Sequence, residues 1–136
     1  MYEKSFISFY EFGHVSHPER TKTLLLEICE EKEILGTVTL SLEGINGSLV
    51  GIDKSITSLL KLLVETLGFK RLLINQSIIN SAPFDRLVIR IKDEIVTSGF
   101  QNHGFRNSNY VDPKDWDDFT KKDNVLTIDV RNFYEH

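Results

Sequence analysis

The spacing of hydrophobic and polar residues along the first 92 positions predicts strands and helices in a regular order. Residues 4–12 are aromatic and β-branched without a helical period, which is typical of a strand. Residues 37–43 alternate strictly, so one face of that strand is expected to be buried. The hydrophobic members of that stretch are Val38, Leu40 and Leu42. Hydrophobic residues recur at helical spacing in residues 18–33 and 53–67.

Residues 86–92 form a third stretch with a clear strand pattern. Its hydrophobic positions, which we expect in the core, are Leu87, Ile89 and Ile91. Its basic positions, which share the opposite face, are Arg86, Arg90 and Lys92. With shorter strands at residues 48–51 and 72–74, the order β-α-β-β-α-β predicts an α+β fold. This fold is a ferredoxin-like sandwich, in which two helices cover one face of the sheet.

Short polar motifs predict where these elements begin and end. Asn46-Gly47 is a strong hairpin signal, because a type I′ turn needs positive φ at both central residues. Ser16 and Glu19 fit a capping box at the start of the first helix, and Asp53 is placed to cap the second. Gly68 stands where a left-handed residue commonly ends a helix.

The last 40 residues have a different pattern. Residues 97–110 lack periodicity, Asp112-Pro113 predicts a short helix, and residues 125–130 read as a buried strand. We therefore expect three parts. They are a ferredoxin-like domain at residues 1–96, a linker with a short helix at 97–122, and the start of a second, truncated α/β domain at 123–136.

Composition excludes several classes of protein. With 136 residues, 40% hydrophobic and 26% charged, the chain resembles neither a collagen, a disordered tail nor a disulfide scaffold. Cys29 is the single cysteine, so neither an intrachain disulfide nor a cysteine-built zinc site is possible. No apolar run approaches the length of a membrane span, and the first residues lack the build of a secretory signal. We expect a cytoplasmic protein.

The charge is unevenly distributed. The chain has a net charge of −4, but residues 70–106 carry a net charge of +3. An RNA would be repelled by the mean charge and could still bind this middle third. The basic residues considered for such contact are Lys70, Arg71, Arg86, Arg90 and Lys92.

Three ordered motifs are similar to a known family. They are the segments 43–48 (EGINGS), 84–97 (FDRLVIRIKDEIVT) and 110–116 (YVDPKDW). Together they resemble the amino-terminal part of the rhodanese-domain tRNA uridine hydroxylases, which form 5-hydroxyuridine at the wobble position with molecular oxygen. The resemblance implies tRNA as a partner, molecular oxygen as a co-substrate and no bound cofactor.

The tail carries a fourth motif of the same family. Asp129, Arg131 and Glu135 match the Asp-Val-Arg-x-x-x-Glu signature that opens a rhodanese domain. In that family the catalytic cysteine lies further downstream, so the resemblance implies no catalytic residue in this chain. It also implies that this chain alone is inactive and that its own carboxy-terminal rhodanese domain is a partner.

Each candidate for RNA binding also has a structural explanation. Arg86, Arg90 and Lys92 could contact phosphates, or they could form the solvated face of an antiparallel sheet. Asn46 and Gly47 could belong to a binding loop, but turn chemistry explains the same residues and we favour it. Aromatic residues of the first strand could stack bases or lie in the core, and the core is the simpler interpretation.

Other chemistry is not supported by the residues. His14 and His17 lack a third ligand nearby, so we predict no metal site. Cys29 lies on the hydrophobic stripe of the first helix, which indicates a structural role. Acylphosphatase chemistry needs an arginine between the first strand and the first helix, and residues 13–17 contain none.

Two functions remain open at this point. The first is a tRNA-positioning domain of an oxygen-dependent tRNA uridine hydroxylase. The alternative is a protein–protein or dimerisation module of a rhodanese-type sulfurtransferase, possible as a homodimer. The acidic total charge favours the alternative, because dedicated RNA-binding domains are usually basic.

Overall fold

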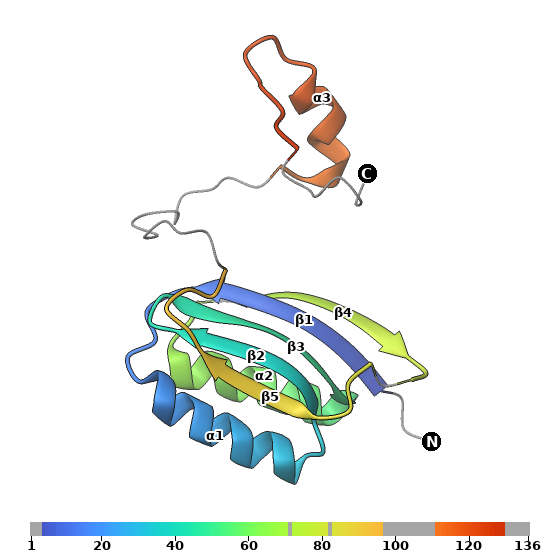
Figure 1. Ribbon diagram of the computed structural model, residues 1–136. Helices are drawn as coiled ribbons and strands as arrows, with labels where there is room; N and C mark the ends of the chain where they lie inside the picture. The colour runs from blue at the N-terminus through green and yellow to red at the C-terminus, as the bar shows by residue number, and fades with distance from the viewer. Residues whose placement is uncertain (1–3, 71, 82, 97–110, 130–136) are drawn as a thin grey trace. The chain divides into compact units, whose positions relative to one another are not determined.

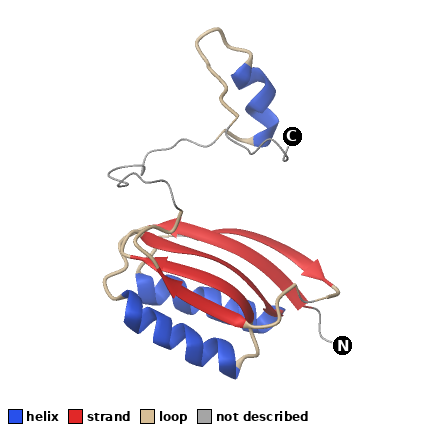
Figure 2. Cartoon of the chain, in the orientation of Figure 1, coloured by secondary structure: helices blue, strands red, loops and turns tan. Residues whose placement is uncertain are grey.

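The computed structural model describes residues 4–70, 72–81, 83–96 and 111–129. The chain divides into two compact units, Met1–Asn102 and His103–His136, and each is described by itself. The first unit is a five-stranded sheet with two helices packed on one face (Figures 1 and 2). The predicted α+β, ferredoxin-like fold is confirmed.

The sheet contains β1 (Lys4–Phe12), β2 (Leu35–Ser41), β3 (Gly44–Ile52), β4 (Leu73–Ile79) and β5 (Leu87–Ile91). Its strand order is β4-β1-β3-β2-β5, with β2 and β5 parallel and all other neighbours antiparallel. The helices are α1 (Pro18–Glu31) and α2 (Asp53–Leu67). β4 and β5 therefore lie at opposite edges of the sheet.

Alternation along the strands determines the core, as the sequence predicted. Every second residue of each central strand points toward the helices, and most of these residues are buried. Both helices contribute their hydrophobic stripes. The sheet contributes Ile7, Phe9, Val38, Leu40, Ile45, Leu49 and Ile89. The helices contribute Leu25, Cys29, Ile56, Leu59 and Leu63. Each such side chain contributes about 1.5–3 kcal/mol by leaving water, so this face holds the unit together.

The hairpin prediction at Asn46-Gly47 was wrong. Both residues lie inside β3, and the turn is formed by Leu42 and Glu43, closed by the pairing of Ser41 with Gly44. Leu42 is consequently 61% exposed rather than buried. The glycine at position 47 serves packing instead of a turn. A Cβ there would lie 2.8 Å from Cζ of Phe9, so the phenyl ring occupies that space.

The predicted helix caps were partly wrong. His17, not Ser16, is the N-cap of α1, and no side chain caps it. Asp53 is the first residue of α2 rather than its cap. Its Oδ1 accepts hydrogen bonds from Ser5 Oγ and Gln76 Nε2, both at 2.7 Å, which join α2 to β1 and β4. Gly68 ends α2 in the left-handed conformation, as predicted.

The second unit contains the predicted short helix but not the predicted strand. A 3-10 turn, η2 (Pro113–Asp115), leads into α3 (Trp116–Thr120), and the Asp112 carboxylate accepts a hydrogen bond from the Lys114 N–H. Residues 125–129 form no strand, and Ile128 is 71% exposed. The prediction of a buried strand is therefore wrong for these residues, because no neighbouring strand in the described residues pairs with them. Arg131 and Glu135 of the rhodanese signature lie outside the described residues.

Candidate functional site

The face of the sheet opposite α1 and α2, here called the open face, carries the predicted basic residues. No helix of residues 4–96 covers it (Figure 1). Pairing of β5 with β2 places Leu87, Ile89 and Ile91 on the helix side, as expected. Arg90 therefore lies on the open face, and Arg86 and Lys92 follow the same alternation at either end of β5. All three side chains are exposed.

The register of the five strands defines two rows of residues across the open face. The central row, from β4 to β5, is Leu73, Tyr10, Asn46, Thr39 and Arg90. The neighbouring row, which is rich in hydroxyl groups, is Asn75, Ser8, Ser48, Thr37 and Val88. Side chains in one row are about 5 Å from their neighbours, so their groups can contact one ligand together.

Hydrophobic side chains cover the open face at its two ends. At one end Phe84 stacks on Phe6, with ring centroids 6.1 Å apart, and Val50 beside them is buried. At the other end Ile95 is buried over Gly44. Two hydrogen bonds hold this segment: Ile95 N–H donates to Glu43 Oε1 at 2.9 Å, and Asn46 Nδ2 donates to the Ile95 carbonyl at 3.3 Å. The two rows lie between these covered ends.

The predicted RNA-binding residues do not form a single cluster. Lys70 is exposed and precedes β4, at the sheet edge opposite the β5 residues. Arg71 lies outside the described residues. Asn46 faces the open side, whereas Gly47 is buried on the helix side beside Phe9. The structure thus places Arg90 and Asn46 in one row of the open face, with Arg86 and Lys92 at the two ends of β5. Lys70 and Gly47 are separated from them.

The first strand contributes aromatic residues that the sequence interpretation assigned to the core. Phe9 is indeed buried, with 1% of its surface exposed. Tyr10 and Phe12 face the open side, are 37% and 36% exposed, and form an edge-to-face pair with centroids 6.4 Å apart. Strict alternation along residues 4–12 would have separated Phe9 from Tyr10, since neighbours in a strand point to opposite faces.

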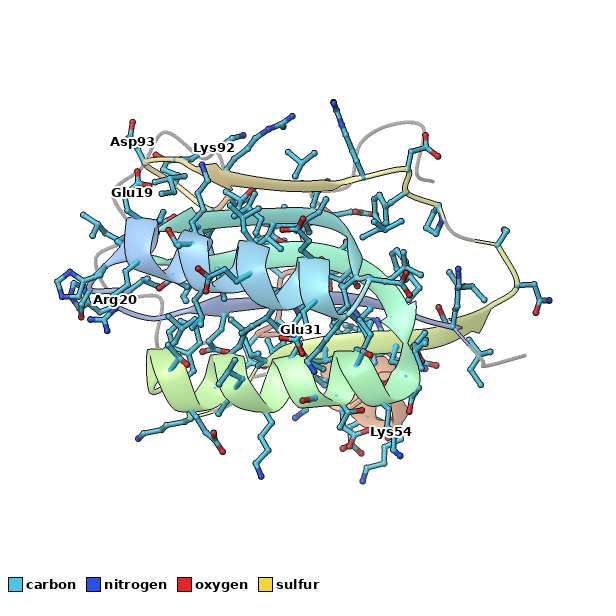
Figure 3. The ribbon with its side chains drawn as sticks, turned by 90° about the horizontal axis from the view of Figure 1, so that it is seen from below. Glu19, Arg20, Glu31, Lys54, Lys92 and Asp93 are labelled. Atoms are coloured by element: carbon cyan, nitrogen blue, oxygen red, sulfur yellow. The ribbon has the colours of Figure 1, made fainter. Side chains whose placement is uncertain are left out.

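No metal centre is found among the described residues. No group of three His, Cys, Asp or Glu in these parts of the chain lies close enough to hold an ion. His14 and His17 instead line a cavity of about 340 Å³ at the start of α1, together with Arg20, which Figure 3 labels. Both histidines precede α1 in a segment without regular secondary structure, which is where the sequence placed them.

Cys29 has the structural role that its position on the helix predicts. Its side chain is fully buried between α1 and the sheet, and this burial raises the pKa of the thiol from 9.0 to about 11. Cys29 is one of the residues around a cavity of about 620 Å³, together with Glu30, Glu33 and Leu87. A buried, protonated thiol is a poor nucleophile at neutral pH.

Comparisons with known proteins agree with this architecture. Residues 4–95 match the family model described as UPF0176 acylphosphatase like domain. A tRNA uridine(34) hydroxylase of Bartonella henselae is 36% identical over 138 residues, covering 98% of this chain and 45% of the relative. A protein of the same name from Neorickettsia sennetsu is 37% identical over 133 residues, covering 95% of this chain and 47% of the relative. The chain thus spans about half the length of these curated relatives.

The fold is also found in solved structures. The BLUF protein BlrB in its dark state superposes with a TM-score of 0.54 at 14% identity, covering 67% of this chain and 73% of that chain. At this identity the similarity concerns the fold alone. In the described residues, none of the helices has both the length and the hydrophobicity that crossing a bilayer requires.

Proposed function

Because the chain belongs to the family described as UPF0176 acylphosphatase like domain, we propose that it is the tRNA-positioning domain of an oxygen-dependent tRNA uridine hydroxylase. The name of the relatives supports the reaction and the substrate. The observation that carries the positioning role is the open face, on which Arg86, Arg90 and Lys92 lie exposed along one strand.

In this proposal the basic residues bind the backbone of the tRNA. Alternate residues of a strand are about 6.5–7 Å apart, which is the spacing of Arg90 and Lys92. Arg86 precedes Arg90 by four residues, so it lies about 13 Å away and would contact a more distant phosphate. Such contacts release counterions, so the affinity depends on salt concentration. They fix the orientation of the RNA without reading its sequence.

The chemical step belongs to another part of the protein. The only cysteine of this chain is buried and protonated, which suits a structural role. We place the catalytic cysteine in a rhodanese domain that follows the present 136 residues, where molecular oxygen is the co-substrate. The 136-residue chain alone would then bind tRNA without hydroxylating it.

The test is a titration of labelled tRNA by the full-length protein, followed by fluorescence polarisation at several salt concentrations. Arg86→Ala/Arg90→Ala is expected to weaken binding and to reduce the salt slope by about 1.5–2, since two phosphate contacts are lost. Lys54→Ala/Lys61→Ala is the matched control, because it removes two exposed positive charges from α2 on the far side of the sheet (Figure 3 labels Lys54). Equal affinities and slopes for the two double variants would contradict the proposal.

The second candidate function is a dimerisation or protein–protein module of a rhodanese-type sulfurtransferase. The net charge of −4 favours it, because repulsion opposes RNA binding by the chain as a whole. Analytical ultracentrifugation and assays of sulfur transfer and hydroxylation separate the two functions. A stable dimer that transfers sulfur and does not bind tRNA would support the second.

A further inference from the structure

The central row of the open face combines the groups that recognise a nucleotide. Tyr10 offers an aromatic ring, Asn46 an amide, Thr39 a hydroxyl and Arg90 a guanidinium. They lie on four adjacent strands in this order, so the row spans about 14 Å from β1 to β5. Each group occupies its own strand, which keeps their relative positions fixed by the backbone ladder.

The aromatic end of the row is exposed in the middle of the open face. Tyr10 lies 37% exposed on β1, which has a paired strand on each side, whereas Phe9 beside it is almost fully buried. Phe12 meets the Tyr10 ring edge to face at an interplanar angle of 76°, which supports the orientation of that ring. An exposed ring on a rigid sheet is a surface on which a base can stack.

The middle of the row is suited to polar contacts. The hydrogen bond from Asn46 Nδ2 to the Ile95 carbonyl fixes the orientation of this amide. The adjacent hydroxyl row of Ser8, Ser48 and Thr37 runs parallel to it. Hydroxyl and amide groups at this spacing match the 2′-hydroxyls and base edges of RNA.

Resting on the function proposed above, we infer that the open face binds unpaired RNA, with a base stacked on Tyr10 and a backbone phosphate at Arg90. In a duplex each base is stacked between its neighbours and its face is inaccessible to Tyr10. The covered ends at Phe84 and Ile95 bound the row on both sides. The ligand is therefore a single-stranded segment that crosses the strands, rather than a double helix.

The experiment measures binding of a short single-stranded RNA and of the same strand in a duplex to the full-length protein. Tyr10→Thr keeps a residue that favours strands but removes the ring, and it is expected to weaken single-strand binding about 5-fold to 100-fold. Tyr10→Phe keeps the ring and is expected to bind within about 3-fold of the natural protein. The duplex is expected to bind more weakly and to respond little to Tyr10→Thr. Circular dichroism confirms that each variant is folded.

A second measurement does not depend on variants. Single-stranded RNA containing 5-iodouridine is bound, irradiated with long-wavelength light, and the cross-linked peptide is identified by mass spectrometry. A cross-link to the peptide that contains Tyr10 and Phe12 is expected. Cross-links confined to other peptides would overturn the inference.

The outcomes separate this inference from the proposed function. If Arg86→Ala/Arg90→Ala weakens tRNA binding while Tyr10→Thr changes nothing, the inference fails and the positioning role stands. If the natural protein binds neither tRNA nor single-stranded RNA, the proposed function itself fails. Tighter binding of the duplex than of the single strand would also overturn the inference.

Discussion

The two faces of one sheet differ in almost every physical property, although the same strands form both. On the helix side, residues such as Phe9, Leu40 and Leu49 are excluded from water. On the open face, Tyr10 and Ser48, which are adjacent to Phe9 and Leu49 in sequence, are partly exposed. Alternate residues of a strand point to opposite faces. Each strand therefore contributes some side chains that stabilise the core and others that are available for binding.

The largest expected effect comes from the helix side. Phe9→Ala removes a fully buried ring and is expected to cost about 3–5 kcal/mol of unfolding free energy. Ser8→Ala changes the adjacent residue of β1, which faces the open side, and is expected to stay within about 0.5 kcal/mol. Urea unfolding followed by circular dichroism measures both. Similar costs for the two variants would contradict the assignment of the faces.

The second effect depends on pH. Burial raises the pKa of the Cys29 thiol from 9.0 to about 11, so the folded state holds this proton more tightly than the unfolded state. The associated stability is fully present below pH 9 and is lost as the pH rises through 11, by about 2–3 kcal/mol in total. The unfolding free energies of the natural protein and of Cys29→Ala are measured from pH 8 to about 11. The natural protein should lose this additional stability as the pH rises, and Cys29→Ala should not. Parallel curves would contradict it.

The third effect is smaller and concerns a buried hydroxyl group on the helix side. Ser5 Oγ is buried on the helix side and donates to Asp53 Oδ1. Asp53→Ala removes this acceptor and is expected to cost about 1–2 kcal/mol, whereas Lys54→Ala, next in sequence on α2, should cost little. Thermal unfolding compares the two variants, and equal melting temperatures would argue against a stabilising role of the Asp53 hydrogen bonds.

The sequence predicted the helix side better than the open face. Period-two and helical spacing identified the core residues of β5 and of both helices, because burial selects hydrophobic residues at each such position. The open face gives a weaker signal, since solvent tolerates many residue types there. Tyr10 was assigned to the core because its chemistry suits either environment, although alternation along residues 4–12 places it on the face opposite Phe9.

Errors at Asn46-Gly47 and residues 125–129 have a common cause. Each segment has a local preference, for a turn at Asn46-Gly47 and for a strand at residues 125–129. Residues far away in the chain nevertheless determine which structure each segment adopts. The ring of Phe9 packs against Gly47, its partner on the neighbouring strand, where a Cβ would lie too close to the ring. The glycine is therefore explained by packing inside a strand and not by a turn. A strand at residues 125–129 needs a hydrogen-bonding neighbour, and the described residues provide none. Such long-range contacts cannot be predicted from the residues of either segment alone.

The anchoring of Ile95 has a consequence for any segment that follows the sheet. The hydrogen bonds of Ile95 with Glu43 and Asn46 attach the outgoing chain to the β2–β3 hairpin, beyond the end of β5 at Ile91. The chain is therefore still held to the sheet four residues beyond Ile91. Loss of these two hydrogen bonds would move the point at which the chain leaves the sheet back from Ile95 toward the end of β5.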